Sequence, residues 1–377
     1  MHVAAGVEDS TNMHPSTNGT GVCNGLTVVD VFIDTACDKT LKEGALQVLG
    51  VARPHWPAKK IHFKLFTEGL TNTLLGCWEN EDGDDGVLLR IYGHNTELII
   101  DRKAEMANMQ LLHAHNLAAP LYCAFRNGLC YGYNPGRVGD VHLVREPHVS
   151  KLIAQTLARM HSVSTYSEGL DAGPSLFPTM HKYLSLIPTA FADVKKNTRF
   201  LQCIPSKRDL EREVKQLEEH LLQLGSPVVF CHNDLLLKNF IYQEKEDKVV
   251  FIDFEYANNN FQAFDIGNHF CEFCGVDGFD SSLYPSREFQ LKWLRHYLEE
   301  WYSLTKRGPA VTDLDIELLY VQVNKFALAS CMFWCMWALI QAEHSTIKFD
   351  YLQFAVDRLK MYMERKQEFI SLSMPKF

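Results

Sequence analysis

The chain has 377 residues, of which 46% are hydrophobic, and this is enough to bury one large core or two lobes. Lysine and arginine number 37 against 46 aspartates and glutamates, so the net charge of −9 argues against a nucleic-acid-binding surface, which needs clustered positive charge. Eleven cysteines, with no signal peptide ahead of them, are typical of reduced thiols in an intracellular protein. We therefore expect a cytoplasmic location.

Residues 1–24 are rich in Ser, Thr, Asn and Gly and carry little apolar pattern, which predicts a disordered tail. Residues 40–51 predict a short amphipathic helix, and strands are expected over 60–66, 74–79 and 86–92. The loop 67–73 between the first two strands has the position of a hairpin that lies over nucleotide phosphates. It has one glycine only, so an ordinary hairpin turn explains it equally well on local grounds.

The third expected strand carries Arg90 in the context where a protein kinase has its phosphate-binding lysine. Arginine suits this task because its guanidinium can bind two phosphate oxygens at once. Glu105 lies in the predicted helix 102–115, and an Arg90–Glu105 ion pair would copy the Lys–Glu pair of kinases. The alternative is an exposed strand arginine and a solvated helix glutamate.

Residues 120–133 predict two further strands, and Asn134-Pro135-Gly136 then breaks the pattern. We expect an N-terminal ATP-binding lobe over 25–134 and a C-terminal catalytic and substrate-binding lobe over 135–377. The second lobe is mainly helical, with helices predicted over 148–163, 177–200, 206–224, 287–304 and 312–342. The last of these contains an apolar run of fifteen residues, 326–340, which is shorter than the ~20 residues of a membrane span. It predicts a buried core helix and no membrane span.

The stretch 227–272 contains the candidate catalytic and metal-binding residues. One strand-like run, 228–231, leads to Asp234, and a second, 249–252, leads to Asp253, with a predicted hairpin between them. Asn239 follows Asp234 by five positions. Phosphoryl transfer from ATP uses an aspartate that accepts the hydroxyl proton, together with an asparagine and a second aspartate that hold Mg²⁺. Asp234 is therefore the candidate base, and Asn239 and Asp253 are the candidate Mg²⁺ ligands.

Two segments, CHNDLLLKN and FIDFEYANNNFQAFDIGNHFCEF, resemble the signature of the choline/ethanolamine kinase family, which is H-N-D-x-x-x-x-N followed by I-D-[FY]-E-Y and F-D-I-x-N-H-F. The resemblance covers nearly the whole chain beyond about residue 25. It implies an α+β, two-lobed protein-kinase-like fold with a small antiparallel-sheet N-lobe and a large, mostly helical C-lobe. It also implies that Asp265 hydrogen bonds the catalytic loop. The segment Leu235–Lys238 looks like the ethanolamine branch of the family, because choline kinases typically carry Gln-Glu-Gly there.

The resemblance further implies the ligand contacts. The loop 67–73 matches the family's phosphate loop, so nucleotide contacts are expected from Gly69, Thr71 and Asn72. An ammonium ligand would be held by aromatic ring faces and nearby carboxylates, although aromatic stripes on helices are more often core. The residues at the family's amine-site positions are Tyr256, Glu272, Trp334, Trp337 and Tyr351, and the charge would come from Glu255 or Glu272. The sequence departs from the family near position 259, where a tyrosine is usual and this chain has Asn258-Asn259-Asn260.

These observations predict an ATP-dependent kinase that phosphorylates the hydroxyl of ethanolamine to give phosphoethanolamine, the first step of phosphatidylethanolamine synthesis. A choline kinase and a catalytically inactive nucleotide-binding scaffold are the alternatives, and the intact Asp234, Asn239 and Asp253 argue against the second. A protein kinase is disfavoured because H-R-D, D-F-G and A-P-E are absent. The expected partner is a small amino alcohol, and a homodimer is compatible with this assignment.

Overall fold

The computed structural model describes residues 20–23, 25–66, 72–80, 85–93, 101–165, 173–276, 278–308, 310–345 and 347–375. The chain forms two compact units. The first comprises residues 1–98 and 119–134, and the second comprises 99–118 and 135–377. The segment 99–118, which we expected within the N-terminal lobe, thus groups with the second unit.

The first unit is built on a seven-stranded sheet with the order β1-β2-β6-β7-β5-β4-β3. Neighbouring strands are antiparallel except for β2 and β6, which are parallel. The helix α1 (Asp38–Ala52) places Leu41, Ala45, Val48 and Leu49 in one buried cluster with Leu75, Cys77 and Leu89 of the sheet. The strands are β1 (Thr20–Cys23), β2 (Leu26–Val29), β3 (His62–Phe66), β4 (Asn72–Trp78), β5 (Val87–Tyr92), β6 (Leu121–Phe125) and β7 (Gly128–Gly132).

One sequence expectation fails at the start of this sheet. The disordered tail was predicted to reach residue 24, but residues 20–23 form β1 and pair in antiparallel register with β2, Thr20 opposite Val29. A strand of four residues is too short to give a hydrophobic alternation, and its pairing partner supplies the missing stabilisation. Residues 1–19 lie outside the described residues.

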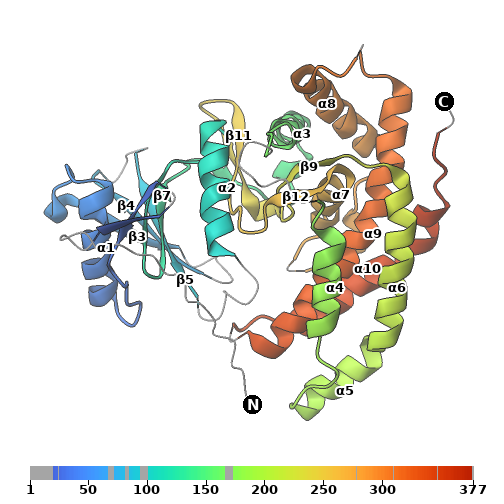
Figure 1. The fold of residues 1–377 in the computed structure, drawn as a ribbon, viewed down its shortest axis with the longest axis horizontal. Helices are drawn as coiled ribbons and strands as arrows, with labels where there is room; N and C mark the ends of the chain where they lie inside the picture. The colour runs from blue at the N-terminus through green and yellow to red at the C-terminus, as the bar shows by residue number, and fades with distance from the viewer. Residues whose placement is uncertain are drawn as a thin grey trace, which may run out of the picture. The chain divides into compact units, whose positions relative to one another are not determined.

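The second unit is mostly helical. The helices α9 and α10, drawn in orange to red in Figure 1, pack along one another, and α7 packs against α9. By length and composition α9 could cross a membrane, but 94% of its most apolar window is buried inside the protein, as predicted for a core helix. The helices are α2 (Arg102–Ala114), α3 (Pro147–His161), α4 (Leu176–Leu186), α5 (Val194–Cys203), α6 (Lys207–Leu221), α7 (Gln262–Glu272), α8 (Arg287–Thr305), α9 (Asp313–His344) and α10 (Tyr351–Ser371).

The predicted irregular helix over 177–200 is two helices, α4 and α5. Pro188 explains the break, because the residue before a proline is disfavoured in helical conformation and Ile187 has ψ 138. The helix α5 then begins at Val194, after the N-cap Asp193, whose side chain accepts a hydrogen bond from the Lys196 backbone N–H.

Two small sheets position the candidate active site. The strands β10 (Phe240–Gln243) and β11 (Lys248–Phe251) form the predicted hairpin, and β8 (Arg137–Val138) pairs with the other edge of β10. The strand β9 (Val228–Cys231) pairs with β12 (Asn258–Phe261), Cys231 opposite Asn258. Strand β12 was not predicted, because asparagine is disfavoured in strands and Asn258-Asn259-Asn260 looks like a turn.

Candidate active site

The strands that lead to the candidate base and to a candidate metal ligand are each followed by a residue with a left-handed backbone conformation. Asn233, two residues after β9, has φ 64, and Asp253, two residues after β11, has φ 67. This conformation is unfavourable for residues other than glycine, so neighbouring contacts must hold it in place. The turns set the direction in which Asp234 and Asp253 leave their strands.

Asp265 of α7 holds the first of these turns. Its two carboxylate oxygens accept hydrogen bonds from the backbone N–H groups of His232 (2.8 Å) and Asn233 (2.7 Å). The Nε2 of His161 in α3 lies 2.8 Å from the same carboxylate. Burial opposes the ionisation of Asp265, yet these hydrogen bonds and the nearby histidines outweigh it and hold its pKa below its ordinary value. The prediction that Asp265 hydrogen bonds the catalytic loop is confirmed.

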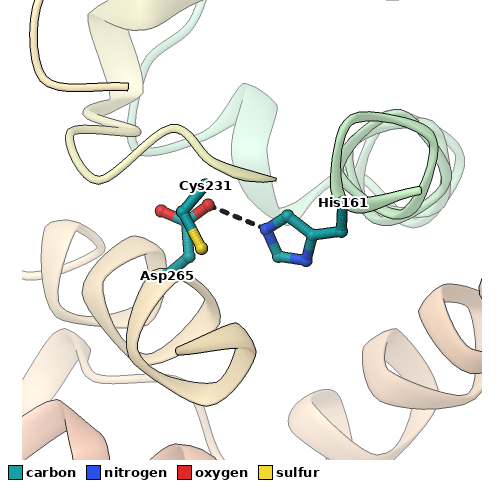
Figure 2. A group of neighbouring side chains, drawn as sticks. All are labelled: His161, Cys231 and Asp265. Atoms are coloured by element: carbon teal, nitrogen blue, oxygen red, sulfur yellow. Dashed lines mark hydrogen bonds and ion pairs between the residues drawn. The ribbon is translucent and has the colours of Figure 1, made fainter. Parts of the chain in front are cut away.

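Figure 2 shows the side chains of His161, Cys231 and Asp265, whose nitrogen, sulfur and oxygen atoms lie within 4.8 Å of one another. All three are already engaged. The Cys231 thiol donates to the carbonyl of Phe261 (3.7 Å), and Nδ1 of His161 lies 2.6 Å from the hydroxyl of Tyr297. Burial raises the pKa of the Cys231 thiol well above its ordinary value, which favours the neutral thiol that donates this hydrogen bond. We therefore interpret the group as a buried hydrogen-bond network that supports the loop.

The asparagine strand supports the same turn from the other side. The amide of Asn233 donates to the side-chain oxygen of Asn258 (2.8 Å) and to the carbonyl of Tyr256 (2.9 Å). The amide of Asn260 donates back to the Asn233 side-chain oxygen (2.8 Å). The family departure noted near position 259 thus gives a paired strand whose asparagines bind Asn233, and it leaves the predicted metal ligands in place.

The two strand ends are tied together beside the candidate base. The side-chain amide of Asn239 donates to the carbonyl of Asp234 (2.8 Å) and to its Oδ2 (3.4 Å), which leaves the amide oxygen as the acceptor atom. The backbone N–H of Ile252 donates to the carbonyl of Asn239 (3.0 Å), and Nε2 of His232 lies 3.0 Å from the carbonyl of Ile252. These bonds bring the two predicted segments into one site.

Asp234 is buried, with 6% of its surface exposed. Burial raises its pKa well above the ordinary value, and the negative charges of Asp253, Glu272 and Glu255 raise it further, while Arg358 lowers it. A carboxylate in these surroundings is a stronger base than one in water. The excess of negative charge also indicates that the site is built for a cation.

Asp253 belongs to a group of three carboxylates, with Glu105 and Glu255, whose oxygens lie within 4.8 Å of one another. Arg102 contacts two of them, at 2.8 Å from Glu105 and 3.4 Å from Glu255. Carboxylate and amide oxygens are the donors that Mg²⁺ prefers, so Asn239 and Asp253 fit the predicted ion. The structure thereby also adds Arg102 as a partner of Glu105.

Four of the predicted amine-site residues form a continuous set of ring contacts. Tyr256 packs edge-on to Trp334 (centroids 5.5 Å apart), Trp334 packs against Trp337 (5.3 Å), and Trp337 packs against Tyr351 (5.7 Å). Two of these rings are also anchored by hydrogen bonds. The indole N–H of Trp334 donates to the side-chain oxygen of Asn268 (2.7 Å), and that of Trp337 donates to the hydroxyl of Tyr256 (3.0 Å). We call these four residues the aromatic group.

The two predicted acceptors lie in different surroundings. Glu255 belongs to the carboxylate group near Asp253. Glu272 is almost fully buried and is paired with Arg358 of α10, whose Nη2 lies 2.9 Å from Oε1 and 3.0 Å from Oε2. Burial raises the pKa of Glu272, while Arg358 opposes that rise. The guanidinium of Arg358 also lies over the ring of Phe354 (4.7 Å), and Phe354 in turn contacts Trp337 (6.5 Å).

The predicted nucleotide contacts are described only in part. Arg90 is buried in the middle of β5, opposite Leu74 on one side and Leu129 on the other. Asn72 begins β4, and its side-chain oxygen accepts a hydrogen bond from Gly93 N–H (3.4 Å). Gly69 and Thr71 lie outside the described residues. Arg90 and Glu105 belong to different units, so the Arg90–Glu105 pair stays a prediction.

Three residues that contact the predicted site residues were not identified from the sequence. Arg102 stands three positions before Glu105, a helical spacing that could have suggested their ion pair. Phe354 follows Tyr351 by one helical turn, so the same periodicity could have added it to the aromatic group. Arg358 gives no such signal, because its partner Glu272 is 86 positions away.

The chain was compared with known proteins. The choline/ethanolamine kinase family profile matches residues 63–363. Ethanolamine kinase 1 of Mus musculus is 47% identical over 92% of this chain and 95% of its own length, and the ethanolamine kinase of Drosophila melanogaster is 39% identical over 92% and 81%. Among solved structures, an ethanolamine kinase of Plasmodium vivax superposes with a TM-score of 0.75 and 25% identity, covering 88% of this chain and 90% of that one.

A choline kinase structure from Cryptosporidium parvum, 22% identical, shares the fold with a TM-score of 0.70 over 87% of this chain and 96% of that one. The predicted α+β, protein-kinase-like fold is confirmed by these likenesses. The signature segments, the extent of the profile match and the identity to full-length relatives agree with one another. The chain therefore belongs to the choline/ethanolamine kinase family.

Proposed function

We propose that this protein transfers the γ-phosphoryl group of ATP to the hydroxyl of ethanolamine, giving phosphoethanolamine for phosphatidylethanolamine synthesis in the cytoplasm. The observation that carries the proposal is the buried Asp234, which lies beside Asn239 at a strand end tied to the one that leads to Asp253. The relatives' names supply the acceptor, because two proteins that align over 92% of this chain, from Mus musculus and Homo sapiens, are each named ethanolamine kinase 1.

In the proposed mechanism Asp234 orients the substrate hydroxyl and accepts its proton as the oxygen attacks. Asn239 and Asp253 would hold Mg²⁺, and the ion supplies charge neutralisation for the phosphate oxygens. Arg90 would bind phosphate oxygens and Glu105 would orient it, with Gly69, Thr71 and Asn72 as further nucleotide contacts.

Amine recognition would fall to the aromatic group and the two glutamates. Ring faces attract any ammonium, so Tyr256, Trp334, Trp337 and Tyr351 do not separate ethanolamine from choline. Ethanolamine differs in presenting three N–H donors, which need acceptors once they are buried. Glu255 and Glu272 are the candidate acceptors. Both already have an arginine nearby, Arg102 for Glu255 and Arg358 for Glu272, but Oε1 of Glu272 accepts no hydrogen bond from the residues that the structure describes. A ligand that lacks the donors would leave this buried oxygen without a hydrogen bond, and that is costly.

The test is the ratio of kcat/KM for ethanolamine to kcat/KM for choline at saturating Mg·ATP. A site that hydrogen bonds its substrate can reject an analogue without donors by about 10⁴, and partial solvent access reduces this, so we expect at least roughly a hundredfold. Comparable values, or choline ahead, would contradict the ethanolamine assignment and leave the phosphoryl-transfer chemistry standing. Absence of turnover with both amines would instead favour an inactive scaffold.

A further inference from the structure

The helix α5 has apolar side chains on two sides. On its inner side Phe200 is buried, and its ring packs edge-on to that of Phe191 (centroids 5.1 Å apart). On its outer side Val194 and Leu201 are 78% and 63% exposed, more than any other large hydrophobic residue that the structure describes. They stand seven positions apart, which is close to two helical turns, and so they share one face. Packing among the described residues therefore explains the inner side of α5 but not the outer one.

The end of α4 and the start of α6 meet near α5. The ammonium of Lys207 in α6 donates to the carbonyl of Ser185 in α4 (3.3 Å). The linker after α4 is tied to α5, because the backbone N–H of Phe191 donates to the side-chain oxygen of Asn197 (2.9 Å). In Figure 1 α5 lies at the lower end of the second unit, below α4 and α6. Leu186, next to Ser185, is 46% exposed, so a third apolar side chain lies at the same end of this unit.

The same segment is strongly basic. Residues 182–208 contain six lysines and arginines and a single acidic residue, in a chain whose net charge is −9. Two of the six face the protein, since Lys196 donates to the carbonyl of Ala342 and Arg199 binds Asp350 (2.8 Å). Three others are exposed to solvent. We call the exposed apolar and basic side chains at this end the α5 surface, which comprises Leu186, Val194 and Leu201 with Lys182, Lys195 and Arg208.

Exposed apolar side chains beside basic ones suit an anionic lipid surface. The apolar groups enter the boundary between head groups and acyl chains, and the basic groups attract anionic head groups. A second copy of the chain fits less well, because two such surfaces that met would bring like charges together. A stable protein partner commonly covers ~800 Å² on each side, whereas α5 is a helix of ten residues at one end of its unit.

We propose that the α5 surface docks the protein reversibly on anionic lipid membranes. Val194 and Leu201 enter the interface, and the three exposed basic side chains bind the head groups. The apolar side chains are few, and stable anchoring to a membrane generally takes two signals, so binding needs both parts of the surface. Salt screens the electrostatic part, so binding weakens as the ionic strength rises. None of these residues belongs to the candidate active site, and the proposal does not depend on the reaction.

The experiment is flotation of the full chain with lipid vesicles. One set contains phosphatidylserine in phosphatidylcholine, and the other contains phosphatidylcholine alone. We expect the parent to float with the first set at low salt, to float much less with the second, and to be released at high salt. Each basic side chain near such a surface contributes about a fivefold factor, so Lys182→Gln/Lys195→Gln/Arg208→Gln should lower the partition coefficient by at least about tenfold. Val194→Ser/Leu201→Ser should lower it by at least about tenfold as well.

Matched controls remove the same groups from other parts of the second unit. Leu222→Ser/Leu304→Ser replaces two leucines that are 53% and 45% exposed, outside the α5 surface. Lys215→Gln/Lys292→Gln/Lys360→Gln removes three exposed lysines from α6, α8 and α10. Both controls should float as the parent does. Unfolding midpoints in urea close to the parental value show that each variant is folded, since exposed substitutions of this kind have small effects on stability.

The proposal is overturned if the parent does not float with vesicles that contain phosphatidylserine, or if either α5 variant floats as well as the parent. Equal flotation with the two sets of vesicles would remove the role of the basic side chains and overturn it too. Sedimentation velocity tests the other occupant. A parental dimer that becomes a monomer in Val194→Ser/Leu201→Ser would assign the α5 surface to a second copy of the chain, against the proposal. These measurements need no turnover, so their outcome is separate from that of the proposed function.

Discussion

The loop 232–239, which contains the candidate base Asp234, and the aromatic group are held by different kinds of contact. Around the loop, backbone N–H groups of His232 and Asn233 bind Asp265, and the side chain of Asn233 binds Asn258 of β12. These are buried polar contacts, in which each lost partner leaves another group unsatisfied. The aromatic group is held chiefly by ring packing, with two indole N–H groups as its anchors.

The difference predicts a division of labour, in which the loop serves the chemical step and the aromatic group serves amine binding. Packing of large rings tolerates small changes of shape, whereas a buried polar network has one satisfied arrangement. We therefore expect changes in the loop to affect the chemical step for every substrate, and changes in the aromatic group to affect how tightly the amine is bound. The following predictions test this contrast, from the largest expected effect to the smallest.

Asp234→Asn should keep ATP binding and lose turnover. The amide retains the shape of the side chain but cannot accept the hydroxyl proton, and a positioned base contributes typically about 10²–10⁴ in rate. The measurement is kcat with ethanolamine, with Asp247→Asn on the exposed turn of the neighbouring hairpin as control. Retention of more than roughly a tenth of the parental kcat would show that Asp234 is not the base.

Arg358→Met should destabilise the fold by about 3–5 kcal/mol, because it leaves Glu272 buried without its counter-charge. The double variant Arg358→Met/Glu272→Gln removes both charges and should recover part of this loss. The free energies of unfolding from urea titrations give the comparison. Equal destabilisation in the single and double variants would mean that packing of Arg358 on Phe354, and not the ion pair, accounts for the loss.

His269 should make the stability of the fold depend on pH. Burial lowers the pKa of His269 from 6.5 to about 4, and its Nδ1 lies 3.1 Å from the carbonyl of Leu235, next to the candidate base. Between these pH values the unfolded chain takes up a proton that the folded chain does not, so stability falls as pH drops from 6.5 towards 4. The contribution is roughly 3 kcal/mol.

This pH dependence is measured by urea unfolding at pH 7 and pH 4.5 for the parent and for His269→Gln. The glutamine can still donate to Leu235 but does not titrate. We expect the variant to lose less stability on acidification than the parent does. The same loss in both proteins would assign the acid sensitivity to other groups.

Trp337→Phe should have the smallest effect. The phenyl ring keeps an aromatic wall but loses the hydrogen bond to the Tyr256 hydroxyl, which is worth about 1 kcal/mol. We expect KM for ethanolamine to rise about fivefold with little change in kcat. A large fall in kcat with KM unchanged would place Trp337 in the chemical step and contradict the division of labour.

Much of this architecture could be predicted from local patterns. Asp234 and Asp253 follow apolar runs that are strands in the structure, and the hairpin between them has the predicted position. Alternation, turn composition and motif spacing are local signals, which is why these features could be found. Asp265 was identified only because the segment around it resembles a known family.

The remainder depends on contacts between distant parts of the chain. Strand β12 forms because its asparagines pair with β9 and bind Asn233, and this overrides their poor strand propensity. The Arg358–Glu272 pair joins α10 to α7, and the local sequence around either residue does not predict the other. Glu272 is therefore paired with Arg358, and its position in the motif did not predict this partner.

The most direct test of the account is the ethanolamine-to-choline ratio of kcat/KM, measured for the parent, Asp234→Asn and Trp337→Phe under identical conditions. The account predicts a parental ratio of at least roughly a hundred. It predicts the same ratio in Asp234→Asn despite its loss of turnover, and the same ratio in Trp337→Phe despite its weaker amine binding, because ring faces attract either ammonium. A parental ratio near one would contradict the assigned substrate. A ratio that shifts with Asp234→Asn would contradict the separation of the chemical step from amine binding.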